Sequence, residues 1–261
     1  MRQPVSKTEK KDSVRAVERA LDILQVFTFE EPRLTLAEVC ADIGLPKTTV
    51  YRILTTLEQQ GFLVVDSTTG KYQLGYEMIK LGAIAQETNN LNSVAKDEMA
   101  AVCSYTQQTC NIYIREGYER LCIAQIAGSQ YVRRHSYLGA RHPLYCGAGK
   151  LLLAYTSDEF QEEYFKHVVL ERFTEKTTTD KDELKKDLLK IRKEGYSVTL
   201  GERDEATAMV AMPLFDYTNK CVAAITISGP VYYFTDENIE KYIACLRQAS
   251  EKISQRLGYH S

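Results

Sequence analysis

The stretch from Leu45 to Leu63 constrains the fold of this chain more than any other segment. Apolar residues recur there at the spacing of one helix face. The opposite face is hydroxylated and cationic, and no acidic residue lies between Leu45 and Leu57. Such a face suits a DNA major groove, where it can bind phosphates and base edges. Taken alone, the pattern is more typical of an ordinary amphipathic surface helix. The cationic and hydroxylated face carries Lys47, Thr48, Thr49, Tyr51, Arg52 and Thr55.

The residues before this segment predict a second short helix. Thr35 with Glu38 three positions later forms a capping-box pattern, which marks a helix start. Gly44 favours a helix end, because glycine adopts the left-handed conformation at little cost. Pro46 suits the start of the next helix. The sequence therefore predicts two short helices joined by about three residues, a helix-turn-helix.

The residues after this segment predict a β-hairpin. Residues 62–65 and 71–74 have strand character, and the polar run Asp66 to Gly70 between them has turn chemistry. A hairpin directly after a helix-turn-helix is a wing. Upstream, another helix is expected to open near Ser13, after a polar arm, with Val17, Leu21 and Leu24 as its apolar stripe.

Three segments, SVRAVERALDILQVF, LTLAEVCADIGLPKTTVYRILTTLEQQGFL and GKYQLG, resemble the DNA-binding half of the IclR family of bacterial transcriptional regulators. The resemblance extends from Ser13 to Leu91. It implies a disordered arm over 1–12, a winged helix-turn-helix domain over 13–74, a linker helix over 75–91 and an effector-binding domain over 92–261. We expect DNA contacts from the cationic and hydroxylated helix face described above and from three further residues. These are Arg15, Thr35 and Lys71.

Charge, cysteine content and the length of apolar runs indicate the partners and the cellular compartment to expect. Residues 1–75 contain 10 basic and 10 acidic residues, so bulk charge does not support nucleic-acid binding, and only the local charge of one helix face does. The seven cysteines form no CxxC pair, and no apolar leader precedes them, which favours reduced thiols in the cytoplasm. No apolar run approaches the ~18 residues of a membrane span. We expect no metal and no cofactor.

The second half has the pattern of an α+β domain, with helices on either side of a run of mostly antiparallel strands. The segments PLYCGAGKLLLA, KEGYSVTLGERDEATAMVAMPLFD and AAITISGP resemble the effector-binding domain of the same family, which is a GAF-like sheet with flanking helices. Strand signals occur at 110–115, 121–126, 131–137, 196–201, 208–215 and 221–228.

A loop entering a helix at Cys146 to Lys150 carries two glycines, and helix starts favour anions. A nucleotide P-loop is excluded, because residue 144 is Leu instead of Gly and residue 151 is Leu instead of Ser or Thr. The residues leave open a small-anion site or a plain tight helix entry; the resemblance implies a carboxylate site. The effector-binding residues that it implies are Gly147, Ala148, Thr199, Thr207, Met209, Thr226 and Ser228.

The sequence thus predicts a non-enzymatic regulator that binds a palindromic DNA operator and a small carboxylate. The resemblance implies dimers that can pair into tetramers, and no catalytic residue. One alternative is an orphan regulator with a vestigial pocket. Another is an enzyme using Cys146 with His142. A basic cluster near the expected pocket entrance favours a solvated loop over an anion funnel; it comprises Arg133, Arg134, His135, Arg141 and His142.

Overall fold

The computed structural model describes residues 14–88, 90–129 and 137–260. The chain divides into two compact units, one ending at Thr88 and the other beginning at Asn89. The arm expected over 1–12 and most of the strand expected over 131–137 lie outside the described residues. Each unit is built around its own apolar core, and each is described by itself below.

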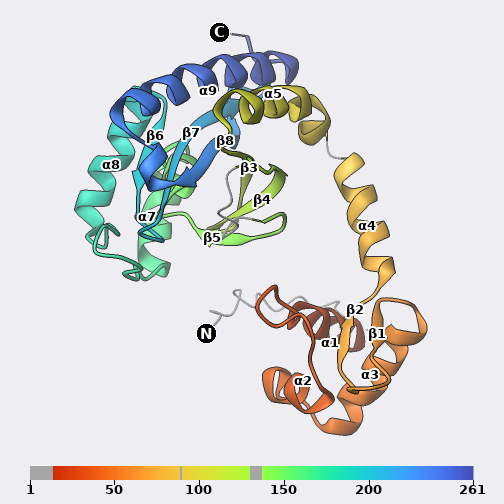
Figure 1. Cartoon of the computed structure of the whole chain (residues 1–261). Coiled ribbons are helices and arrows are strands. Elements are labelled where there is room, and N and C mark those ends of the chain that lie inside the picture. Colours follow the sequence, from red (N-terminus) through yellow and green to blue (C-terminus); the bar gives the residue numbers. More distant parts are fainter. Residues whose placement is uncertain (1–13, 89, 130–136, 261) are drawn as a thin grey trace. The chain divides into compact units, whose positions relative to one another are not determined.

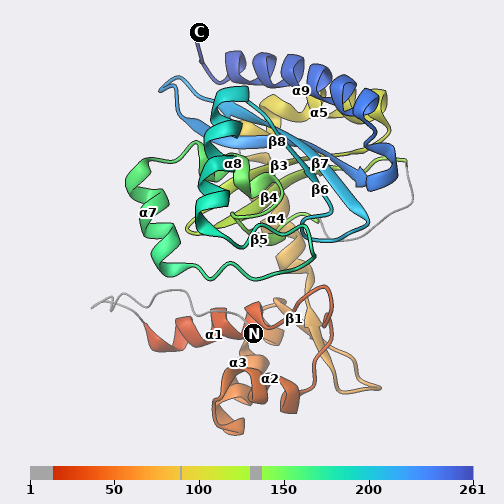
Figure 2. The ribbon, with the colours of Figure 1, turned by 90° about the vertical axis from the view of Figure 1, so that its left-hand side faces the viewer.

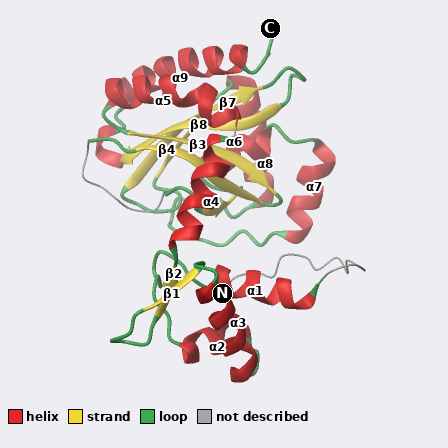
Figure 3. Cartoon of the chain, turned by 90° about the vertical axis from the view of Figure 1, so that its right-hand side faces the viewer, coloured by secondary structure: helices red, strands yellow, loops and turns green. Residues whose placement is uncertain are grey.

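Unit 1 contains three helices, α1 (Arg15–Gln25), α2 (Leu36–Ile43) and α3 (Lys47–Gln59). The capping box is confirmed: the Thr35 hydroxyl accepts the Glu38 N–H at 3.3 Å, and the Glu38 carboxylate accepts the Thr35 N–H at 2.7 Å. Gly44 ends α2 with a φ of 68°, a left-handed conformation. Two helices with this short connection form the predicted helix-turn-helix (Figure 3). The core of the unit is formed by Ile23, Phe27, Leu34, Val39, Val50, Leu54, Leu63 and Tyr72.

The apolar spacing in α1 does not correctly predict which of its residues face this core. Spacing alone predicts an inward stripe of Val17, Leu21 and Leu24. In the structure Val17 and Leu21 are exposed, and Ile23 is fully buried. The prediction was wrong for Val17 and Leu21 and correct for Leu24, which is half-buried against the core. Only the C-terminal end of α1 packs against the rest of the unit, which leaves the earlier turns uncovered.

The wing is a two-stranded antiparallel sheet of β1 (Leu63–Val65) and β2 (Tyr72–Leu74). The Asp66 carboxylate organises its turn by accepting the N–H groups of Thr68 and Thr69 at 2.8 and 3.1 Å. A bridge from Leu34 to Tyr72 ties the wing to the segment before α2. Helix α4 (Tyr76–Glu87) follows the wing and buries none of its residues.

Unit 2 is built on a six-stranded sheet in the order β5-β4-β3-β8-β7-β6, in which every neighbouring pair is antiparallel. The α+β class is therefore confirmed. The strands are β3 (Thr109–Glu116), β4 (Glu119–Ile126), β5 (Arg141–Pro143), β6 (Ser197–Leu200), β7 (Thr207–Phe215) and β8 (Cys221–Pro230).

Helices cover both faces of this sheet (Figures 1 and 2). Helices α5 (Asn90–Thr106) and α9 (Asp236–Arg256) lie side by side on one face and bury Ile112, Val210 and Ile225 beneath them. The other face carries α6 (Ala148–Ala154) and α8 (Lys181–Glu194), with α7 (Asp158–His167) beside them. A short 3₁₀ turn, Val231–Tyr233, joins β8 to α9. We call the sheet face beneath α6 and α8 the α6 face.

Two local predictions in unit 2 need correction. The linker helix was expected to extend to residue 91, yet α4 ends at Glu87 and α5 already begins at Asn90, where the Ser93 hydroxyl donates to the Asn90 carbonyl at 2.9 Å. Arg141 and His142 were expected in a loop, yet they lie in β5. These two residues form a strand because β5 pairs with β4, where His142 lies opposite Arg120. The local sequence pattern cannot predict pairing between segments that are distant along the chain.

Candidate functional sites

The outward face of α3 is largely exposed within unit 1. Val50 and Leu54 are fully buried on its inner side. On the outer side Lys47, Thr48, Tyr51 and Arg52 are exposed, as predicted. Thr49 and Thr55 are half-buried, and the Thr55 hydroxyl donates to the Tyr51 carbonyl at 2.9 Å. The structure therefore leaves long cationic and aromatic side chains on one solvent-facing surface, which we call the α3 surface.

The three other residues expected to contact DNA lie in different surroundings. Arg15 is exposed in the first turn of α1, and Lys71 is half-buried just before β2 of the wing. The hydrogen bonds of the Thr35 side chain are made within its own helix cap. Its hydroxyl accepts the Glu38 N–H and donates to the Glu38 carboxylate at 2.8 Å. Its first role is to fix the start of α2.

The register of the sheet brings together the expected pocket residues of unit 2. Thr199 pairs with Met209, and Met209 pairs with Ser228. Thr226 lies two residues before Ser228 and Thr207 two residues before Met209, so all five share one face, the α6 face. Thr226 and Thr199 are buried, while Thr207, Met209 and Ser228 are half-buried.

Two amide side chains, Asn111 and Gln125, belong to the same site and were missed by the sequence reasoning. Asn111 Nδ2 donates to the Ser228 hydroxyl at 2.9 Å and to the Thr226 hydroxyl at 3.4 Å. Gln125 Nε2 donates to Asn111 Oδ1 at 2.8 Å. We call these four residues the amide–hydroxyl cluster. The sequence does contain a signal for them, because each amide lies within an apolar run, in CNIYI and in LCIAQI.

The backbone of the α6 entry is already engaged by a carboxylate of the protein. The Gly147 N–H donates to Glu202 Oε2 at 3.0 Å. Lys150, only 3% exposed, donates to Glu202 Oε1 at 2.6 Å and to Asp187 Oδ2 at 3.0 Å. Burial works to lower the pKa of Lys150, but the two carboxylates outweigh it and raise the pKa above its usual value. Ala148, the other backbone position expected to bind an anion, is fully buried.

The environment of Cys146 does not resemble that of an activated nucleophile. The residue is fully buried, and this burial raises the pKa of its thiol. Catalytic cysteines need the opposite shift, towards the thiolate. His142 Nε2 faces Arg203 Nη1 at 3.2 Å, so that ring nitrogen is engaged by a guanidinium group.

The basic residues expected at the pocket entrance do not act as one group. Arg141 forms ion pairs with Glu116 and, at 3.9 Å, with Glu119, and His142 is buried. Arg133, Arg134 and His135 lie outside the described residues. In the part of the chain that the structure describes, no group of three His, Cys, Asp or Glu residues could hold a metal ion. None of the described helices is both long and apolar enough to cross a membrane.

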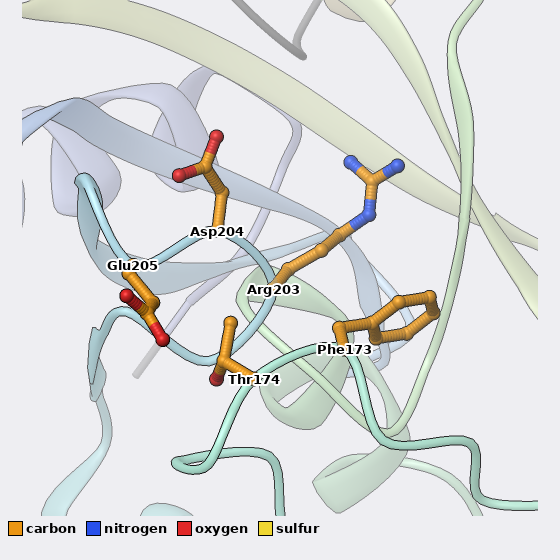
Figure 4. A pocket seen from close by; sticks show the side chains of 5 residues that line it. All are labelled: Phe173, Thr174, Arg203, Asp204 and Glu205. Carbon is orange, nitrogen blue, oxygen red and sulfur yellow. The ribbon is translucent and has the colours of Figure 1, made fainter.

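A pocket of about 430 Å³ opens beside Arg203 (Figure 4). It lies between the loop after β6 and the loop that precedes α8. The Arg203 side chain extends on the same side as the Phe173 ring, and its Cζ lies 6.0 Å from the centre of that ring. The carboxylates of Asp204 and Glu205 point away from the Arg203 guanidinium. The pocket is lined by Phe173, Thr174, Arg203, Asp204 and Glu205.

Comparison with known proteins matches both units. Residues 16–67 match the model of the IclR helix-turn-helix domain, and residues 84–255 match that of the bacterial transcriptional regulator IclR C-terminal domain. The chain is 30% identical to the HTH-type transcriptional regulator KipR of Bacillus subtilis, over 94% of this chain and 98% of KipR.

Solved structures share the fold over nearly the whole chain. An IclR transcriptional regulator from Alicyclobacillus acidocaldarius is 27% identical, with a TM-score of 0.85 over 94% of this chain and 99% of that one. An IclR homologue from Microbacterium hydrocarbonoxydans, solved in complex with 4-hydroxybenzoate, has a TM-score of 0.82 at 22% identity, over 93% and 98% of the two chains. At that identity the second likeness establishes the fold alone.

Proposed function

The chain belongs to the IclR family of bacterial transcriptional regulators, and we propose that it binds a specific operator with an affinity that changes when a small organic acid binds unit 2. The α3 surface carries the first part of this proposal. It presents Lys47, Tyr51 and Arg52 to solvent on a helix held rigidly by Val50 and Leu54. The remaining DNA contacts come from Arg15 in α1 and Lys71 in the wing, with Thr35 holding the start of α2. Such a regulator acts in the cytoplasm, where the operator lies.

The DNA-bound form is a homodimer, and helix α4 supports this part of the proposal. Four large apolar side chains on α4 are exposed: Tyr76, Ile79, Leu81 and Ile84. Large apolar side chains exposed together on one helix favour an interaction site. One short recognition helix contacts too few base pairs for genomic selectivity, so a second copy of the chain is the occupant that the function requires. Two such dimers pair into a tetramer through unit 2.

Selection of bound fragments from random-sequence DNA tests the DNA-binding part of the proposal. We expect an enriched inverted repeat with half-site centres about 10 base pairs apart, or a multiple of that spacing. Sedimentation of the same preparation at micromolar concentration should give a dimer or a tetramer. Binding without any enriched sequence, or full-strength binding of a monomer to one half-site, contradicts this part.

The effector part of the proposal rests on the α6 face. Hydroxyl and amide groups gather there in an otherwise apolar layer, and the half-buried Ser228 and Met209 give a ligand access to them. The bound 4-hydroxybenzoate of the Microbacterium homologue, an aromatic carboxylate, supports the class of ligand. The effector carboxylate binds Thr226 and Ser228, in a pocket bordered by Thr199, Thr207 and Met209. To reach the backbone near Gly147 and Ala148 as well, it displaces the Glu202 carboxylate from the Gly147 N–H.

We expect Ser228→Ala to weaken effector binding by ~1.5–3 kcal/mol, the range for hydrogen bonds to charged groups. The substitution removes the hydroxyl and leaves Asn111 Nδ2 with one acceptor fewer. Operator affinity without effector should stay unchanged, because Ser228 belongs to unit 2. Calorimetry with an acid identified by thermal-shift screening measures the first effect. If neither Ser228→Ala nor Thr226→Val changes the affinity, the ligand does not bind at the amide–hydroxyl cluster.

A further inference from the structure

Two arginines lie near the entry of α6, and neither has an acidic partner among the residues that the structure describes. Arg120 is only 3% exposed, and its Nη1 donates to the backbone carbonyls of Cys146 and, at 3.4 Å, Pro143. Its buried Nε has no hydrogen-bond partner. Arg203 is half-buried, and its Nη1 lies 3.2 Å from His142 Nε2. We call Arg120 and Arg203 the guanidinium pair.

The two guanidinium groups belong to one site. Arg120 lies directly opposite His142 in the β4–β5 register, and His142 contacts Arg203. Burial, and next the charge of Arg120, lower the pKa of Arg203. A methyl group added at Gly147 would lie 3.0 Å from Arg120 Nη2, which places this guanidinium against the α6 entry.

No described acidic side chain neutralises the pair. Neither arginine has a carboxylate within 4.0 Å among the described residues, and the sequence over 130–136 contains no acidic residue. The neighbouring acid, Glu202, is held by Lys150 and the Gly147 N–H. Because a buried cation without a counter-charge costs free energy, such a pair is retained where a ligand supplies the charge.

We propose that the effector carries a second anionic group and that the guanidinium pair binds it. This inference rests on the proposed function and specifies the class of its ligand. The first carboxylate binds as described above, and the second group bridges Arg120 and Arg203 through charge-assisted hydrogen bonds. The pocket of about 430 Å³ beside Arg203 gives the second group access to this arginine, although Arg120 does not line that pocket. The second group is a carboxylate or a phosphate, since the planar guanidinium fork suits both.

Calorimetry on the full-length protein tests the charge of the ligand. The dicarboxylates from malonate to adipate are compared with their monoamides, which keep the size but lose one charge, and 3-phosphoglycerate provides the phosphate arm. We expect at least one dianion to bind about tenfold or more tightly than its matched monoanion, a difference of ~1.4 kcal/mol. Which arm shows the preference identifies the second group. Equal affinity within every pair, or no binding by any dianion, overturns the inference.

Substitution of Arg203 tests the location. Arg203→Gln removes the charge from a half-buried loop position, and it should abolish the preference for the dianion while leaving monoanion affinity unchanged. Arg192→Gln, at an exposed position on α8, is the matched control and should keep the preference. Arg120→Met should act like Arg203→Gln if circular dichroism shows that it folds. A preference retained in Arg203→Gln overturns the assignment.

The same panel separates this inference from the proposed function when operator affinity is measured with each acid. If monoanions change operator affinity and dianions have no advantage, the guanidinium pair is not a ligand site, and the proposed function stands. If no acid of either class changes operator affinity, the effector part of the proposed function fails as well.

Discussion

Replacing Lys150 with methionine is expected to destabilise unit 2 by about 3 kcal/mol, the lower end of the range for removing one partner of a buried ion pair. The Lys150 side chain is 4% exposed and that of Glu202 is 12% exposed, so Glu202 would remain largely buried with only the Gly147 N–H as its donor. The more exposed Asp187 contributes less. Hydrogen exchange of α6 and α8 in the full-length protein measures the loss.

Two further variants show whether the loss comes from the unpaired carboxylate. Lys190→Met removes an exposed lysine from α8 and should change stability by less than about 0.5 kcal/mol. Adding Glu202→Gln to Lys150→Met should recover part of the loss, because the second change removes the unpaired charge. Wild-type stability in Lys150→Met would show that the network is not needed to hold the α6 entry.

This ion pair also predicts how stability depends on pH. The pKa of Lys150 is raised in the folded state, so its contribution is complete below the unfolded-state pKa of about 10.5 and is lost as the pH rises through the folded-state value. Over the neutral range the contribution is therefore constant.

The second large effect is expected from Arg52→Ala, which should weaken binding to the selected operator by ~1–3 kcal/mol for each half-site that Arg52 contacts. In a dimer the substitution acts twice, which gives a total of ~2–6 kcal/mol. Arg52 is exposed, so its loss creates no cavity and should leave the melting temperature unchanged. Gel shifts with the operator and with a scrambled sequence of equal length measure the effect on specificity.

The matched control for this prediction is Arg192→Ala, which removes the same charge from an exposed position in unit 2. It should bind the operator like the wild type. If Arg52→Ala bound operator and scrambled DNA with wild-type affinities, the α3 surface would not be the surface that reads the sequence.

Unit 1 could be predicted largely from its sequence, because its signals are local. The capping box at Thr35, the left-handed Gly44 and the buried Val50 and Leu54 all follow from residues within a few positions of one another. The inward face of α1 could not be predicted in the same way. Which of its turns are covered depends on tertiary packing, and Val17 is exposed although its spacing fits a core stripe.

The candidate site of unit 2 could be predicted only in part. Period-two spacing correctly placed Thr226 and Ser228 on one sheet face. Their partner Asn111 lies more than a hundred residues away in sequence, and only strand pairing brings it to them. Glu202 likewise reaches Gly147 across the fold, so no local pattern could indicate that this N–H already has an acceptor.

The measurement that tests the account most directly is the effector affinity of the full-length protein, free and bound to its operator. Binding at the two sites is coupled through one free energy, so the coupling must be reciprocal. If the effector changes operator affinity by a given factor, calorimetry should show that the operator changes effector affinity by the same factor. An effector affinity that is identical with and without operator would contradict the claim that a ligand in unit 2 controls DNA binding by unit 1.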